Sequence, residues 1–257
     1  MKHIRILTLF GGLLILALAF GFIFRMPLAL SVWPWEDGRY SYLFVGSILA
    51  AVSAAMLWVG GSGELGVLPA GSLNIFVIAL GTTVYFFSQA LQGRSELFVF
   101  AGVAALMAFV SGGTFLWMHR LFIPSPRLTP MPVRVSFGLF VITLILAGSA
   151  LILRQPVFPW DLNPDSSFVF GCIFLGDAFY FLYGLLRPSW NNGFGQLLSF
   201  LAYDLVLIVP FVQLLDTVQP GHMLSLIVYI GVLVYSGGLA IYYLLVNPQT
   251  RFGVNGW

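Results

Sequence analysis

The feature that most constrains this chain is a series of eight long apolar runs separated by short polar segments. Each run is long enough to cross the hydrocarbon core of a bilayer as a helix. A helix satisfies its own backbone hydrogen-bonding groups in lipid, and the runs lack the residue-by-residue alternation of β-barrel strands. The sequence therefore predicts eight transmembrane helices. They lie near residues 6–24, 41–60, 72–91, 97–118, 135–153, 167–186, 195–215 and 223–246.

The composition agrees with a membrane location for the whole chain. Only 8% of the 257 residues are charged, whereas a soluble domain carries about 25%. A soluble protein of this length could not cover its surface with so few charges. We therefore predict an all-α integral membrane protein that spans the bilayer several times.

The distribution of basic residues predicts the orientation. With eight spans, both termini lie on one side, and that side holds seven of the eleven Lys and Arg residues. Cytoplasmic loops carry the excess of basic residues, so both termini are expected in the cytoplasm. The seven residues are Lys2, Arg5, Arg120, Arg127, Arg134, Arg187 and Arg251.

The two halves of the chain match each other at two constant offsets. Early pairs are separated by 129 residues and later pairs by 125, because the first half carries four extra residues between them. The pairs are Arg5 and Arg134, Arg25 and Arg154, Pro27 and Pro156, then Pro34 and Pro159, Trp35 and Trp160, Glu36 and Asp161, Ser41 and Ser166, and Gly46 and Gly171. We interpret this pattern as a tandem duplication.

The duplication predicts the domain organisation. Residues 1–118 form a first four-helix repeat, residues 119–134 a basic cytoplasmic linker, and residues 135–257 a second four-helix repeat. A unit with an even number of helices keeps its orientation when repeated. The fold is therefore expected to contain two parallel four-helix repeats rather than an inverted pair.

An aromatic, proline and acid box occurs once in each half, just before an apolar run. The stretches are VWPWEDGRYSYLFVG at 32–46 and VFPWDLNPDSSFVFG at 157–171. Tryptophan and phenylalanine favour the headgroup level of a membrane, so we expect two interfacial loops. An extracytoplasmic binding surface built from both loops is the alternative. The box residues are Trp33, Trp35, Glu36, Phe158, Trp160 and Asp161.

The two boxes resemble those of a group of uncharacterised bacterial multi-pass membrane proteins, which carry Trp-Pro-Trp or Phe-Pro-Trp followed by Leu-x-Pro. The second box fits this pattern through FPWDLNP, and the first departs from it after Glu36. The resemblance implies the inner (plasma) membrane of a bacterium. It implies no activity.

Two acids lie deep inside predicted spans, Asp177 in IFLGDAFYFLYG and Asp204 in LAYDLVLIVP. Each is about ten residues from a helix end, or roughly 15 Å at helical rise. Ionised side chains at this depth are costly and usually face a bundle interior or a cavity. The first half has Val52 at the position of Asp177, so a candidate site is expected in the second half.

These acids suggest a transporter or channel for a small solute or ion, with Asp177, Asp204, Tyr180 and Tyr203 as candidate substrate- or ion-binding residues. The alternatives are a non-catalytic subunit or assembly factor of a membrane complex, and an intramembrane enzyme acting on a lipid-like substrate. A neutral acid that only hydrogen-bonds across helices is the structural alternative for each carboxyl group. The expected partners are the lipid bilayer and a membrane protein or a second copy of the chain.

Several classes of chemistry lack their required residues. Cys172 is the single cysteine, and the three histidines lie outside the spans or at their ends. There is no Gly-x-x-x-x-Gly-Lys loop and no extramembrane domain. We therefore expect no metal, no cofactor, no nucleic-acid partner and no catalytic residue.

Overall fold

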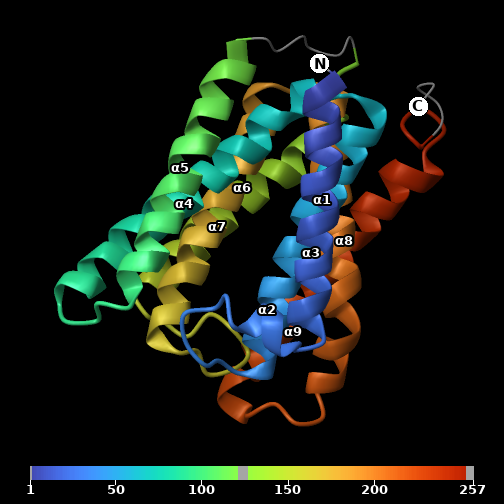
Figure 1. Ribbon diagram of the computed structural model, residues 1–257. Helices are drawn as coiled ribbons and strands as arrows, with labels where there is room; N and C mark the ends of the chain where they lie inside the picture. The colour runs from blue at the N-terminus through green and yellow to red at the C-terminus, as the bar shows by residue number, and fades with distance from the viewer. Residues whose placement is uncertain (1, 121–126, 253–257) are drawn as a thin grey trace. The chain divides into compact units, whose positions relative to one another are not determined.

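Eight helices of membrane-spanning length dominate the computed structural model, which describes residues 2–120 and 127–252 (Figure 1). They confirm the predicted all-α membrane fold. The helices are α1 (Lys2–Ile23), α3 (Arg39–Ser62), α4 (Leu68–Leu91), α5 (Leu97–Arg120), α6 (Met131–Ile152), α7 (Pro164–Leu186), α8 (Trp190–Leu214) and α9 (Met223–Ile241).

Four short elements were not expected from the apolar pattern. A one-turn helix, α2 (Pro27–Leu30), follows α1, and proline at its first position suits a helix start. The 3-10 turns η1 (Leu65–Val67) and η2 (Pro220–His222) precede α4 and α9. A π-helical turn, η3 (Tyr242–Val246), extends α9.

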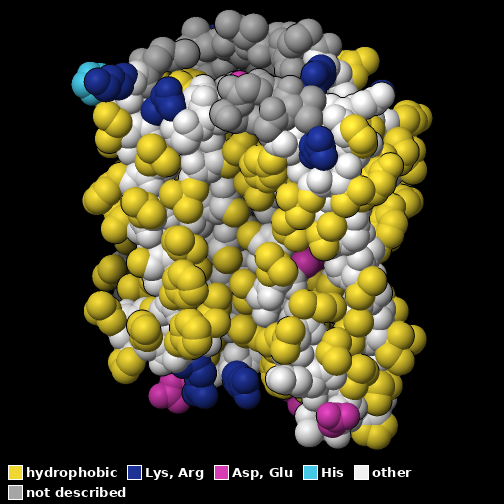
Figure 2. Space-filling view, turned by 90° about the vertical axis from the view of Figure 1, so that its right-hand side faces the viewer, with side chains coloured by type: hydrophobic (Ala, Val, Ile, Leu, Met, Phe, Trp, Pro, Cys, Tyr) yellow, Lys and Arg dark blue, Asp and Glu magenta, His cyan; other side chains and the backbone are white. Residues whose placement is uncertain are grey.

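The surface of the helices is apolar between their ends. Phe109 is 80% exposed and Leu146 66% exposed although both lie well inside spans. Figure 2 shows hydrophobic side chains over much of the face in view, with Lys and Arg side chains toward its upper and lower edges. Apolar surface of this extent requires lipid, so the chain is a multi-pass membrane protein.

The helices form two compact units that combine elements from both halves of the sequence. Unit 1 comprises the described residues of Met1–Leu65, Phe158–Leu162 and Gly193–Trp257, and unit 2 comprises those of Gly66–Val157 and Asn163–Asn192. Unit 1 therefore contains α1, α3, most of α8 and α9. Unit 2 contains α4, α5, α6, α7 and the first residues of α8.

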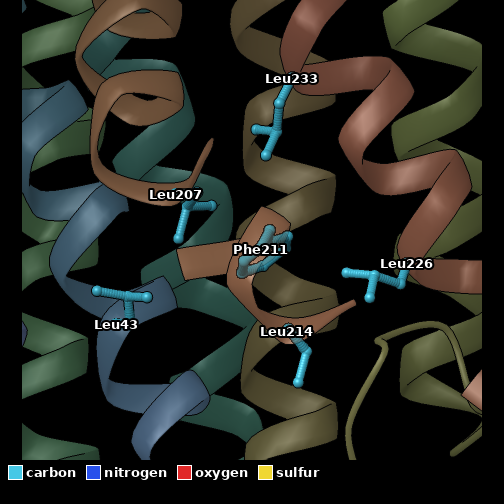
Figure 3. Close-up of a cluster of buried hydrophobic side chains, with 6 residues drawn as sticks. All are labelled: Leu43, Leu207, Phe211, Leu214, Leu226 and Leu233. Carbon is cyan, nitrogen blue, oxygen red and sulfur yellow. The ribbon is translucent and has the colours of Figure 1, made fainter. Parts of the chain in front are cut away.

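The core of unit 1 lies where α3, α8 and α9 meet (Figure 3). Leu43 of α3 packs with side chains of α8 and α9, and Leu207, Phe211 and Leu226 are fully buried. The cluster consists of Leu43, Leu207, Phe211, Leu214, Leu226 and Leu233.

Unit 2 is held by packing of α4 against α5 and α7, and of α6 against α7. The contact of α4 with α7 is close, because a Cβ atom added at Gly81 would lie 2.7 Å from the Cys172 sulfur. Cys172 is accordingly buried. An isolated antiparallel bridge joins Leu128 to Ser189 at one end of the unit.

Candidate functional site

Asp204, in the interior of α8, is the least exposed acid among the described residues. Its side chain is only 4% exposed. The Ser236 hydroxyl of α9 lies 3.1 Å from Asp204 Oδ1 and 2.7 Å from the carbonyl oxygen of Val232. The second carboxyl oxygen, Oδ2, is buried and has no hydrogen-bond partner among the described residues.

Ser236 can serve both charge states of this carboxyl group. A hydroxyl has one proton to donate. When Ser236 donates to the Asp204 carboxylate, it stabilises the charged form. When it donates to the Val232 carbonyl oxygen instead, its own oxygen can accept a hydrogen bond from the protonated, neutral Asp204. The same geometry therefore suits a carboxyl group that gains and loses a proton.

A glycine of α9 leaves space beside the unpartnered oxygen. A Cβ atom added at Gly237 would lie 3.3 Å from Asp204 Oδ2, whereas one added at Gly238 would meet nothing within 4 Å. Any side chain at residue 237 would crowd the carboxyl group. Gly237 thus keeps the approach to Oδ2 narrow but unobstructed.

Two layers of side chains lie between Asp204 and the end of unit 1 where α8 ends and α9 begins. The layer next to the acid is apolar, and the layer beyond it is aromatic. Leu207 and Leu233, one turn from Asp204 and Ser236, are at most 1% exposed. One further turn along, the rings of Phe211 and Tyr229 lie 5.0 Å apart. Asp204 is therefore separated from that end of unit 1 by two layers of packed side chains.

Tyr203, the second predicted site residue on α8, also forms a hydrogen bond with a residue of α9. Its hydroxyl group is hydrogen-bonded to that of Tyr229. Its ring also packs edge-on against Phe44 of α3, with the ring centroids 6.3 Å apart. Tyr203 therefore joins the aromatic layer rather than the Asp204 carboxyl group.

The second box adds its rings to this aromatic layer. Phe158 is 1% exposed, and its ring centroid lies 4.9 Å from that of Phe44 and 5.8 Å from that of Tyr229. The Trp160 indole donates to the Ser41 hydroxyl over 3.2 Å. Phe158 is thus enclosed by protein within unit 1.

The acid of the second box points to solvent. Asp161 has a side chain that is 82% exposed, and its Oδ1 lies 3.1 Å from His222 Nε2. A contact with so exposed a partner contributes about 1 kcal/mol or less. It marks the edge of the aromatic layer, where α9 begins.

The first box packs on the helices that it joins. Trp33 contacts the Phe22 ring edge-on and lies 5.7 Å from Trp35 between ring centroids. Both indoles are half-buried and Glu36 is exposed. The Tyr42 hydroxyl accepts a hydrogen bond of 2.9 Å from the Asp37 backbone N–H, which holds the box at the start of α3.

Asp177 lies in unit 2 and has its own partner. The Asn74 side chain of α4 donates a 2.7 Å hydrogen bond to Asp177 Oδ1. Gly176 permits this approach, because a Cβ atom there would lie 2.7 Å from Asn74 Oδ1. Tyr180 is buried about one turn further along α7. The structure places Asp177 and Asp204 in different units.

Unit 2 also has a polar cluster that the sequence pattern did not single out. Asp165, in the first turn of α7, accepts a 2.8 Å hydrogen bond from Arg94 and another from the Tyr85 hydroxyl. Asn163 caps the same helix through the Asp165 backbone N–H. Each residue is ordinary for a loop or helix end, so only the packing of α4 against α7 reveals the cluster.

Ser236 was also missed. Its one sequence signal is the small-residue stretch Ser-Gly-Gly inside an apolar run, which reads equally well as helix packing. No group of three or more potential metal ligands occurs among residues 2–120 and 127–252. Comparisons with protein-family models, with curated proteins and with solved structures find no match for this chain.

Proposed function

We propose that this protein moves a small solute or an ion across the membrane and that Asp204 exchanges a proton or cation during the cycle. The observation that carries the proposal is the Asp204 carboxyl group itself. It is nearly inaccessible, one oxygen is paired with Ser236, and the other has no partner among the described residues.

Such a carboxyl group is expensive to maintain for structure alone. A charged acid at the centre of a membrane helix costs at least about 2.5 kcal/mol. An unsatisfied buried polar atom costs about 1–3 kcal/mol. Binding of a proton removes the charge, and binding of a cation supplies the missing partner of Oδ2. Either event would change the interactions between α8 and α9.

Asp177 is proposed as a second polar group, within unit 2 and with a lesser role. Its Oδ1 is satisfied by Asn74, so it depends less on a bound ion. Tyr180 would line the approach to Asp177 in unit 2, and Tyr203 would act in unit 1 through the aromatic layer that it joins. The predicted cytoplasmic termini and the bacterial inner membrane belong to the same proposal.

The test is a rapid pH step applied to proteoliposomes on a solid-supported membrane. Proton binding to Asp204 should give the wild-type protein a transient charge displacement, and Asp204→Asn should abolish it. Asp216→Asn changes an exposed acid beyond α8 and should leave the signal unchanged. Equal signals from wild type and Asp204→Asn would contradict the proposal. Sodium steps at constant pH distinguish a metal cation from a proton.

A second variant pair tests the space beside Oδ2. Gly237→Ala places a methyl group 3.3 Å from that oxygen, whereas Gly238→Ala meets nothing within 4 Å. The first should reduce the charge displacement several-fold and the second should not. Unchanged signals in Gly237→Ala would mean that Oδ2 is not where the ion binds.

A further inference from the structure

The two ends of unit 2 carry very different charge. One end holds Arg94, Arg154, Glu96 and Asp165, and the Arg94 guanidinium binds Asp165 at 2.8 Å. The other end is basic, with no Asp or Glu among its described residues. It holds His119, Arg120, Arg127, Arg134 and Arg187, at the ends of α5 and α7 and the start of α6.

Backbone hydrogen bonds draw two of these basic segments together. The Trp190 N–H donates to the Arg127 carbonyl oxygen over 2.8 Å. The Thr129 N–H donates to the Pro188 carbonyl oxygen over 2.8 Å, and the Thr129 hydroxyl donates to the Ser189 carbonyl oxygen over 2.9 Å. The stretch 127–130 therefore runs beside the stretch 187–190, which concentrates positive charge at this end.

The same contact places two helix starts next to each other. α6 begins at Met131 and α8 at Trp190, directly after the joined stretches. The first N–H groups of a helix have no partner within the helix, and its N-terminus carries partial positive charge. Two helix starts therefore add to the attraction that the arginines exert on an anion.

Buried polar atoms at this end include some with no hydrogen-bond partner within the described part of the chain. Arg134 Nε is buried and unpaired, and so is the hydroxyl of Ser189, a residue that is 4% exposed. Arg134 differs in this respect from Arg5, whose guanidinium group has partners within the protein. Arg5, at the matching position of α1, donates to the carbonyl oxygens of Gly60 and Gly61.

We propose that the basic end of unit 2 binds the phosphate of an anionic phospholipid headgroup. The span α6 begins here and the span α7 ends here, so the site lies at headgroup level when both helices cross the bilayer. Large apolar side chains beside it are exposed, including Leu128 at 69%, Met131 at 65% and Leu186 at 71%. These surfaces suit acyl chains, which a free phosphate ion lacks.

The test measures phospholipid binding to the full-length protein in detergent by native mass spectrometry. Phosphatidylglycerol should bind more tightly than phosphatidylcholine with the same acyl chains, and added salt should narrow the difference. An arginine near an anionic surface contributes about fivefold in affinity. Arg134→Gln with Arg187→Gln should therefore weaken phosphatidylglycerol binding on the order of 25-fold.

Arg154→Gln is the matched control, because Arg154 lies at the opposite end of unit 2. It should bind phosphatidylglycerol like the wild type. Equal losses in both variants, or equal binding of the two lipids, would overturn the proposal. Displacement of the lipid by an equal concentration of inorganic phosphate would also overturn it, in favour of a soluble anion. Matching thermal unfolding of wild type and variants confirms that folding is intact.

Discussion

The α1–α3 hairpin of unit 1 and the α6–α7 hairpin of unit 2 have the same local geometry. α1 and α6 each have 22 residues and are offset by 129 throughout. Arg25 and Arg154, the matched residues just after them, have φ values of 54° and 59°. They are the only non-glycine residues with positive φ in the part of the chain that the structure describes.

The packing of the second helix on the first is also the same. A Cβ atom at Gly46 would meet Ile23 at 2.7 Å and the Ala19 carbonyl oxygen at 3.2 Å. One at Gly171 would meet Ile152 and the Gly148 carbonyl oxygen, both at 2.7 Å. Ile152 and Gly148 match Ile23 and Ala19 at the offset of 129. These contacts support the proposed duplication.

The hairpins differ in what their connecting boxes do. The first box packs on its own hairpin, where Trp33 contacts Phe22. The second, Phe158–Leu162, belongs to unit 1, although the helices that it connects lie in unit 2. Matched sequences therefore share backbone geometry, while the packing of their side chains depends on which helices surround them.

The largest expected effect comes from the close-approach glycines. Gly171→Ala should destabilise the protein by about 3 kcal/mol, the upper end for overpacking, because the added methyl group meets backbone. Gly46→Ala should cost less, since Ile23 can adjust its side chain. Thermal unfolding in detergent measures both. Gly102→Ala, where a Cβ meets nothing within 4 Å, is the control, and a cost equal to that of Gly171→Ala would break the comparison.

A smaller loss of stability should follow when Asp177 in the second hairpin is replaced by valine, the residue at the matching position of the first hairpin. Asp177→Val introduces the residue found at position 52 and leaves the buried Asn74 amide without its acceptor, which costs about 2 kcal/mol. Combining it with Asn74→Leu should recover part of that loss. A double-mutant cycle on unfolding free energies measures the coupling, and additive losses would mean that the pair contributes nothing.

The smallest expected change in stability comes from the residues with positive φ that follow α1 and α6, and it should be the same in both hairpins. Arg25→Gly and Arg154→Gly should each stabilise the protein by about 1 kcal/mol, because glycine adopts positive φ without the steric cost of a Cβ atom. Arg25→Ala and Arg154→Ala remove the same charge but keep the Cβ atom, so they should give no gain. A gain in only one hairpin, seen in unfolding midpoints, would argue against a shared turn.

The sequence alone predicted the eight spans and their approximate bounds, because the hydrophobicity of about twenty consecutive residues decides whether a segment enters lipid as a helix. It also identified Asp177 and Asp204, since a carboxyl group is conspicuous in an apolar run. These predictions rest on local properties of the chain.

Only the tertiary structure decided which residues meet. Ser236 and Asn74 are 32 and 103 residues from the acids that they contact, and other hydroxyls and amides in the spans were equally available. The sequence likewise did not predict that Phe158 is buried. Nor did it predict that α1 and α3 group with α8 and α9. The physical reason is that helix association in lipid depends on the shape and small residues of whole helix faces, which short stretches of sequence do not specify.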